Sequence, residues 1–404
     1  MRLVAFAVLV LVAPPPAAVG QGMPRARELG LPIGGTPGPL DAITDVTGVE
    51  VGHTTLVSGS GALVAGRGPV RTGVTVVHPR GRASADPVYG AWFTLNGNGE
   101  MTGTTWLAES GFLEGPIAIT NTHSVGIVRD AILQWQVNRP QSQPWGLPVV
   151  AETYDGLLND INGFHVTAAH TIAALDGARG GGPVAEGNVG GGTGMVCHGF
   201  KGGIGTASRR VGEAAGGWTV GVLVQCNYGS RAALRVAGVP VGEEIPDLLP
   251  CVASPGARSP FVTRSCDAPA PGGEEGGGAG QGSIIVIVAT DAPLLPHQLR
   301  RLAVRVSLGV GRMGGRGENS SGDIFVAFST ANPGANADTG VIRVEALPNA
   351  RINPLFIATV QATEAAIVNA LLAAETMTGA NDVRVYALPR ERLLAAMRRY
   401  GRMP

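Results

Sequence analysis

The chain has 404 residues, of which 44% are hydrophobic and 15% are charged, and its 30 basic side chains balance 30 acidic ones. This length and apolar content suffice to build one large α/β domain or two ordinary ones. The balanced charge gives no electrostatic support for a partner such as nucleic acid or an anionic membrane surface.

Residues 1–20 have the features of a secretory signal peptide. Arg2 precedes an apolar run over residues 3–13, and a proline break and small residues follow it. The apolar run is too short to span a bilayer as a helix. We therefore expect an exported periplasmic or extracellular protein that starts near Gln21 and has no membrane partner after signal removal; an uncleaved N-terminal anchor is the alternative.

Apolar runs rich in Val and Ile recur between glycine turns, and their length and boundaries predict strands. These runs cover residues 70–79, 115–123, 147–156, 218–227, 283–291, 321–332 and 382–389. Helical spacing appears over residues 103–111, 130–138, 165–178, 294–313 and 353–377. Near-continuously apolar strands combined with long helices predict sheets covered by helices, which is a layered α/β fold.

Residues 250–281 interrupt this alternation because they are rich in Pro, Gly and acidic side chains. Such a composition predicts a flexible insert, and a linker between domains is the alternative. Within this insert, Cys251 and Cys266 are a possible disulfide in an oxidising compartment. Cys197 and Cys226 lie in apolar, strand-like contexts, and we expect them to be free buried thiols.

The insert ends at Gly282-Ser283, where "GGGAGQGSIIVIVATD" passes directly from glycine into a strand. A hydroxyl at the start of a buried strand, preceded by glycine, is what a chain needs if its own backbone is to be attacked. Glycine permits the strained backbone that an N-to-O acyl shift requires. The join therefore suggests self-cleavage between these two residues.

Other polar residues lie at the ends of predicted strands, where sites in layered α/β folds are built. Ser321 and Asp323 open one strand, Asn227 ends another, and Glu152 and Tyr154 end a third. In an extended strand residues 321 and 323 share one face, because side chains repeat with period two. Each of these residues also has an ordinary interpretation as a turn residue or a half-buried ring. No GxSxG, GxxxxGK[ST] or HExxH motif is present.

Five segments together resemble the DmpA-type aminopeptidases, a family of L-aminopeptidase/D-amidase-esterases and β-peptidyl aminopeptidases. They are "VVAETYDGLLNDINGFHV", "GGTGMVCHGFKGGIGTASR", "VGVLVQCNYGSR", "GSIIVIVATDAPLLPHQLRRLAVRVSLGVGR" and "NSSGDIFVAFSTAN". The resemblance covers roughly residues 31–392 without most of the insert. The insert and the Asp at position 323, where some relatives carry Glu, depart from the family pattern.

The resemblance implies a proenzyme with a single hydrolase domain over residues 21–404, folded as an αββα sandwich like that of N-terminal nucleophile hydrolases. Self-cleavage would give an α-chain of residues 21–282 and a β-chain of residues 283–404. The family usually assembles as a homotetramer, so we expect a homo-oligomer.

Carried over by position, the resemblance makes Ser283 the nucleophile and Asn227 the oxyanion-hole donor. It makes Ser321 and Asp323 catalytic partners, and it gives Tyr154 the role of polarising or positioning the acyl group. After cleavage the α-amino group of Ser283, whose ordinary pKa is roughly 7.7–8.0, suits a base near neutral pH. No metal or organic cofactor is required.

The expected substrates are small peptides, amides or esters with a free amino group, because Glu152 offers one carboxylate to the substrate ammonium. Trp145 is expected to wall the pocket or to be a plain core aromatic. The sequence does not separate α-, β- and D-amino acid substrates. The alternatives are an acyltransferase of the ornithine acetyltransferase type, disfavoured by the Ser nucleophile and the signal sequence, and an uncleaved, non-catalytic exported binding protein.

Overall fold

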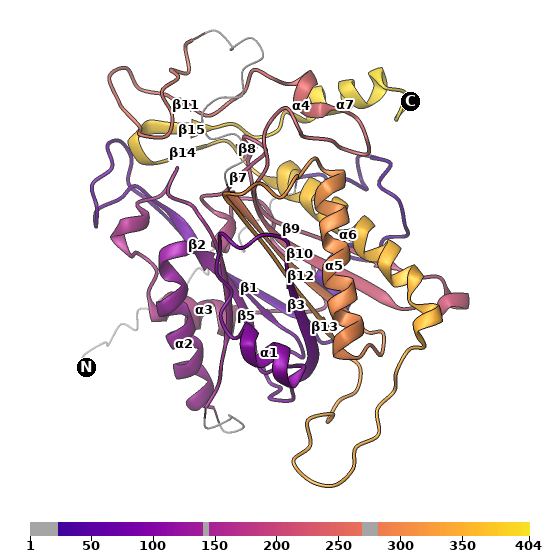
Figure 1. Cartoon of the computed structure of the whole chain (residues 1–404). Helices are drawn as coiled ribbons and strands as arrows, with labels where there is room; N and C mark the ends of the chain where they lie inside the picture. The colour runs from indigo at the N-terminus through magenta and orange to yellow at the C-terminus, as the bar shows by residue number, and fades with distance from the viewer. Residues whose placement is uncertain (1–22, 140–144, 269–281) are drawn as a thin grey trace, which may run out of the picture.

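The computed structural model describes residues 23–139, 145–268 and 282–404. Two sheets pack face to face, and a helical layer covers the outer face of each (Figure 1). Helices α2 (Val125–Val137) and α3 (Ala168–Gly177) cover one sheet, and α5 (Pro296–Arg312) and α6 (Asn353–Ala373) cover the other. The αββα arrangement confirms the predicted layered α/β fold. The proposed signal at residues 1–20 lies outside the described residues.

The first sheet has the strand order β1-β2-β5-β6. Its strands are β1 (Glu50–Ser58), β2 (Val70–His78), β5 (Ile117–Asn121) and β6 (Val149–Thr153). The outer face packs on α2 (Val125–Val137) and α3 (Ala168–Gly177) through an apolar cluster that includes Val74, Val150 and Leu175. The strands β5 and β6 are parallel, so their carboxyl ends meet at one edge.

The second sheet has the order β4-β3-β13-β12-β10-β9. Its strands are β3 (Val88–Thr94), β4 (Phe112–Leu113), β9 (Gly203–Arg210), β10 (Thr219–Asn227), β12 (Gly282–Thr290) and β13 (Ser321–Ser329). Along β12, alternate residues face opposite layers: Ile285 and Ile287 pack between the sheets, whereas Ile284 and Val286 pack under α5 and α6. A continuous apolar run is therefore needed in this strand.

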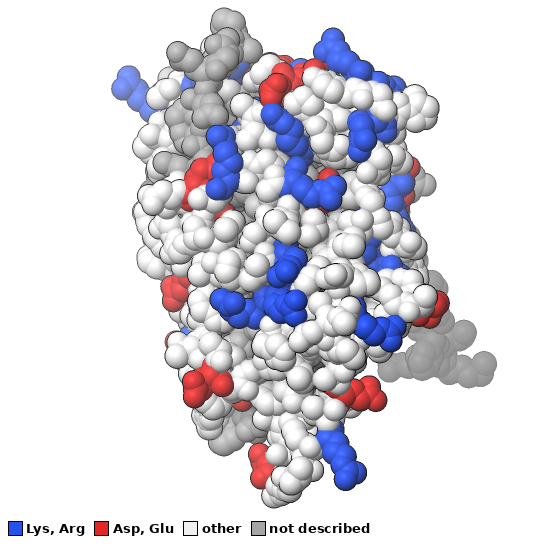
Figure 2. Space-filling view, turned by 45° about the vertical axis from the view of Figure 1, so that its right-hand side comes forward, with Lys and Arg blue, Asp and Glu red and all other residues white. Residues whose placement is uncertain are grey.

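The outer layer of the second sheet consists of α5 (Pro296–Arg312) and α6 (Asn353–Ala373). By length and composition α6 could span a membrane, but 83% of its apolar window is buried in the protein, so it serves as a core helix. Arg301 and Arg305 of α5 lie over the ring of Phe356. Figure 2 turns the side of the molecule that carries α5 and α6 toward the viewer and shows basic side chains on that surface.

The smaller elements lie at the ends of the sandwich. They are α1 (Thr104–Ser110), β7 (Val196–Cys197), β8 (Phe200–Lys201), α4 (Val241–Glu244), β11 (Cys251–Val252), β14 (Met377–Thr378), β15 (Val383–Val385) and α7 (Arg390–Arg399). A small sheet of order β11-β15-β14 lies near β7 and β8 (Figure 1). Each predicted strand and helix corresponds to an observed one. The longer elements β1, β3, β9 and α7 were not predicted, and neither were the short ones β4, β7, β8, β11, β14 and α4.

Both pairs of cysteines are joined. Cys251 bonds Cys266 with a Cα–Cα distance of 4.9 Å, and Cys197 bonds Cys226 at 5.6 Å. The prediction that Cys197 and Cys226 are free thiols is wrong. The two residues are 29 positions apart in sequence, and only the packing of β7 against the end of β10 brings them together.

The predicted flexible insert is only partly described. Its residues 269–281 lie outside the described residues, whereas residues 250–268 are held by defined contacts. Cys251 and Val252 pair with β15, and the backbone N–H of Val252 donates to the carbonyl of Arg264 at 2.8 Å. A disulfide and backbone hydrogen bonds thus tie residues 250–268 to the fold, and the flexibility of the insert stays a prediction.

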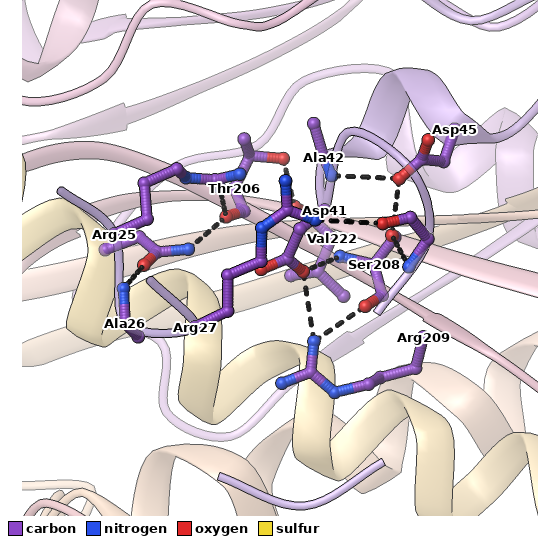
Figure 3. Close-up of polar contacts among 12 residues, drawn as sticks. Arg25, Ala26, Arg27, Asp41, Ala42, Asp45, Thr206, Ser208, Arg209 and Val222 are labelled. Carbon is purple, nitrogen blue, oxygen red and sulfur yellow. Dashed lines mark hydrogen bonds and ion pairs between the residues drawn. The ribbon is translucent and has the colours of Figure 1, made fainter. Parts of the chain in front are cut away.

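The segment before β1 is tied to β9 by a buried polar network (Figure 3). Asp41 accepts hydrogen bonds from the backbone N–H of Ser208 and from the guanidinium of Arg209, both at 3.0 Å. The side chains of Asp41 and Arg209 are only 2% and 3% exposed. Burial lowers the pKa of Arg209, and the charge of Asp41 opposes that shift.

We predict that Asp41→Ala destabilises the protein by about 3–5 kcal/mol, because it leaves the Arg209 charge buried without its partner. Urea unfolding of the purified variant measures the change. The control is Glu213→Ala at the exposed Arg210–Glu213 pair, where we expect less than about 0.5 kcal/mol. Equal effects of the two substitutions would contradict the prediction.

Candidate active site

Ser283 lies at the start of β12, between the end of β10 and the start of β13. Its Cα is paired with Asn227 on the antiparallel side and with Gly322 on the parallel side. The Ser283 hydroxyl is buried and accepts a hydrogen bond from the backbone N–H of Gly322 at 3.2 Å. The register also places Gly282 opposite Ser321. The nitrogen that cleavage would release therefore lies beside the start of β13.

Gly282 cannot be replaced by another residue without strain. Its φ is +143°, a backbone conformation that favours glycine. A Cβ built on it would lie 2.0 Å from the carbonyl oxygen of Asn227. The chain therefore requires glycine immediately before the candidate nucleophile.

Ser321 and Asp323 share one face of β13, as the sequence predicted. The Ser321 hydroxyl donates to Oδ1 of Asp323 at 2.6 Å, and both side chains are buried. Burial raises the pKa of Asp323, while the hydrogen bonds from Ser321 and Asn96 oppose that rise. Among the described contacts, the hydroxyls of Ser321 and Ser283 are not directly hydrogen-bonded, so the sheet register alone relates them.

The side chain of Asn227 is held in one orientation. Its Oδ1 accepts from the backbone N–H of Val196 at 2.7 Å, and its Nδ2 donates to the carbonyl of Tyr154 at 3.0 Å. An amide NH₂ has two hydrogens, so one remains to meet an oxyanion near Ser283. This arrangement matches a preorganised oxyanion donor.

The turn that carries Val196 is held by Lys201, a residue that the sequence did not single out. Its ammonium is fully buried and donates to the carbonyls of Met195 and Gly202, both at 2.9 Å. Burial lowers the pKa of Lys201 to about 7. The Cys197–Cys226 disulfide adjoins both Val196 and Asn227, so two separate links hold the segment that orients the Asn227 amide.

Glu152 lies at the carboxyl end of β6 and is 3% exposed. Its Oε1 accepts from the backbone N–H of Glu100 at 3.1 Å, and its Oε2 accepts from the Thr122 hydroxyl. Burial raises the pKa of Glu152, and these two hydrogen bonds partly offset the rise. No basic side chain among the described residues forms an ion pair with Glu152, so its charge is free to bind a cation.

Tyr154 and Trp145 are placed differently from each other. Tyr154 is close to the site through its backbone carbonyl, while its hydroxyl lies near the backbone of Gly156. Trp145 precedes β6, whereas Glu152 lies near the far end of that strand. Trp145 is 56% exposed, and its ring packs edge to face on Trp106. This exposure shows that Trp145 is not a plain core aromatic. The strand separates it from Glu152, since a strand rises about 3.3 Å per residue, and the expectation that Trp145 walls the substrate pocket stays a prediction.

The segment Leu95–Thr102 crosses from the second sheet to the first at this site, and no strong sequence signal marked it as part of the site. Asn96 accepts from the backbone N–H of Asp323 at 2.6 Å and donates to its carboxylate at 3.3 Å. Gly99 lies against Gly322, where an added Cβ on Gly322 would be 2.7 Å from the Gly99 Cα. One segment thus contacts both the acid pair and, through Glu100, the Glu152 carboxylate.

The described residues contain no cluster of His, Cys, Asp and Glu that could hold a metal ion. What they contain is a buried serine at a strand start, an oriented amide, a hydroxyl–carboxylate pair and a separate buried carboxylate. Within two facing sheets covered by helices, this set of groups defines a hydrolase of the N-terminal nucleophile class.

Comparisons with known proteins agree with this class. The model of peptidase family S58 matches residues 41–385. The chain is 55% identical to the β-peptidyl aminopeptidase BapA of Sphingosinicella microcystinivorans, over 96% of this chain and 95% of that protein. The chain belongs to peptidase family S58 and is a serine aminopeptidase/amidase.

Solved structures give the same result for the fold. A β-aminopeptidase from Burkholderia sp. superposes with a TM-score of 0.80 at 50% identity, and 94% of this chain and 100% of that chain are covered. The L-aminopeptidase D-Ala-esterase/amidase of Ochrobactrum anthropi superposes with a TM-score of 0.81 at 45% identity and the same coverage. The latter structure is described as a variant of the Ntn hydrolase fold.

We predict that Asn96→Ala lowers kcat about 10-fold, which is the effect of losing one hydrogen bond to a charged group. Removing this donor should also raise the pKa of Asp323 further. In a plot of kcat against pH, the rise on the acid side should therefore move to higher pH. Steady-state kinetics across pH measure both changes.

The matched control is Asn98→Ala, because Asn98 donates to the backbone carbonyl of Ser320 rather than to the carboxylate. A loss of kcat in both variants without a shifted pH profile would mean that Asn96 only stabilises the loop. Thermal melts of the two variants separate folding from catalysis.

Proposed function

We propose that the chain matures by cutting itself between Gly282 and Ser283, and that the new N-terminal Ser283 then hydrolyses small substrates with a free amino group. The observation that carries this proposal is the position of Ser283 between an oriented amide on β10 and the hydroxyl–carboxylate pair on β13. Residues 282 and 283 are the first two of one strand, so the reacting hydroxyl and carbonyl are adjacent.

In the proposed maturation, the Ser283 hydroxyl attacks the carbonyl carbon of Gly282, and the peptide nitrogen leaves with a proton as the Ser283 α-amine. Water then hydrolyses the ester, which leaves a carboxylate on Gly282 and restores the hydroxyl. The α-chain would span residues 21–282 and the β-chain residues 283–404.

In the proposed catalytic cycle the α-amine of Ser283 accepts the proton of its own hydroxyl as that oxygen attacks the substrate carbonyl. Asn227 donates to the oxyanion, and the Ser321–Asp323 pair stabilises the protonated amine. The leaving amine takes this proton, and water resolves the acyl-enzyme. In this scheme Tyr154 positions the acyl group through its backbone at the end of β6, where its carbonyl accepts from Asn227, and not through its hydroxyl.

Glu152 is proposed to bind the substrate ammonium, because it is buried, held by two neutral donors and without a cationic partner in the described structure.

We propose substrates that carry an N-terminal β-amino acid. The support is the similarity of this chain to a β-peptidyl aminopeptidase and a β-aminopeptidase. We also propose export, from the sequence of residues 1–20, and a homotetramer, from the family resemblance.

We predict that Ser283→Ala leaves the precursor uncut and inactive, because no hydroxyl is present to attack Gly282. Intact mass under denaturing conditions detects one chain in place of two. Ser283→Cys serves as the control, since a thiol can still attack and should permit cutting. Efficient cleavage of the Ala variant would refute self-processing by this hydroxyl.

We predict that Glu152→Gln raises KM for substrates with a free amine and leaves self-cleavage intact, because the precursor presents no amine there. Since burial raises the pKa of Glu152, the parent's affinity should fall as pH drops through that raised pKa. KM measured against pH shows whether the acid-side rise disappears in the variant. The assignment fails if the parent hydrolyses N-acetylated substrates equally well.

A further inference from the structure

Two aromatic side chains beside the candidate site are left open to solvent. Phe261 and Tyr154 pack edge to face, with ring centroids 6.3 Å apart and an interplanar angle of 78°. Phe261 is 51% exposed and Tyr154 is 40% exposed. The rings adjoin the buried side chains of Ser283, Asn227 and the Ser321–Asp323 pair, so they form an apolar edge next to a polar centre.

Phe261 belongs to the segment closed by the Cys251–Cys266 bond, which we call the disulfide loop (residues 251–266). The start of the loop pairs with β15, and Val262 packs against the cluster of Leu158, Val383 and Val385, which Val196 also contacts. Both cysteines precede Gly282, so cleavage after Gly282 would leave the loop closed and in place. The aromatic edge is thus part of the mature enzyme as well as of the precursor.

The order of strands in the second sheet shows on which side of Ser283 the Phe261–Tyr154 pair lies. β12, which carries Ser283, lies between β13 and β10. Glu152 lies on the β13 side, because Gly99 is packed between its carboxylate and Gly322. The disulfide loop lies on the β10 side: the Tyr154 carbonyl accepts from Asn227 at the end of β10, and Val262 packs near β7. Ser283 is therefore between the carboxylate and the aromatic edge.

We propose that Phe261, packed on Tyr154, is a specificity-determining residue that contacts the leaving-group side of the substrate. This inference rests on the proposed function, in which Glu152 holds the ammonium and Ser283 attacks the carbonyl. A substrate anchored at those two points continues toward Phe261 with the residue after the scissile bond. Aromatic rings gain most from apolar or aromatic partners, so the favoured second residue is apolar or aromatic.

The test compares dipeptides that share one N-terminal residue and differ in the second, which is either Gly or Phe. Phe261→Ala should lower kcat/KM for the Phe dipeptide about 5- to 10-fold, as expected for one lost aromatic contact, and leave the Gly dipeptide within about 2-fold. Phe261→Leu should restore much of the loss. Chain analysis and active-site titration establish that each variant is cut and folded to the same extent.

Phe164→Ala is the matched control, because Phe164 is also exposed but stacks on His123, next to the Thr122 partner of Glu152. It should not change the preference between the two dipeptides. A second series varies the N-terminal residue with the second residue fixed.

Equal losses on Gly and Phe dipeptides, or a Phe261→Ala effect confined to the second series, would overturn the proposal. A double variant Cys251→Ser with Cys266→Ser releases the loop and should lose the same preference for Phe. Failure of the parent to hydrolyse any of the dipeptides would instead count against the proposed function.

Discussion

The site depends on the hydrogen-bonded register of β12 between β10 and β13. An antiparallel neighbour on one side and a parallel neighbour on the other place Asn227, Ser283 and Gly322 in one row. A slip by one residue would turn Ser283 to the opposite face, because side chains alternate along a strand. The apolar residues of β12 are buried on both faces of the sheet. Their packing fixes the register and therefore the relative positions of the site residues.

The segment Leu95–Thr102 adds the second constraint, because it ties one sheet to the other at the site. It contacts the Ser321–Asp323 pair through Asn96 and the Glu152 carboxylate through Glu100. The contact between Gly99 and Gly322 has no room for a Cβ on Gly322, which would lie 2.7 Å from the Gly99 Cα, and little room for one on Gly99, at 3.1 Å from the Gly322 Cα. The separation between the two functional halves is therefore set by backbone packing, which is stiffer than contacts between long side chains.

The sequence predicted the parts of this site that have local signals. The abrupt change from glycine to an apolar strand marked Ser283, and period-two spacing placed Ser321 beside Asp323. Asn96, Lys201 and the Cys197–Cys226 bond had no such signal, since each acts through a partner distant in sequence. The exposure of Trp145 had no local signal either, because the position of an aromatic residue along the chain does not show whether other residues cover it.

The order of strands in the second sheet has a consequence for unfolding. The pair β13-β12 follows the proposed cut, and it is inserted between β3 and β10, which precede the cut. Two chains made by cleavage would share one continuous sheet and one core, so neither could leave without opening hydrogen-bonded ladders on both sides. Refolding of the mature protein would then be a bimolecular event that depends on concentration, while the precursor refolds as one molecule. The lifetime of the mature enzyme would accordingly be set by the rate of its first unfolding rather than by an equilibrium.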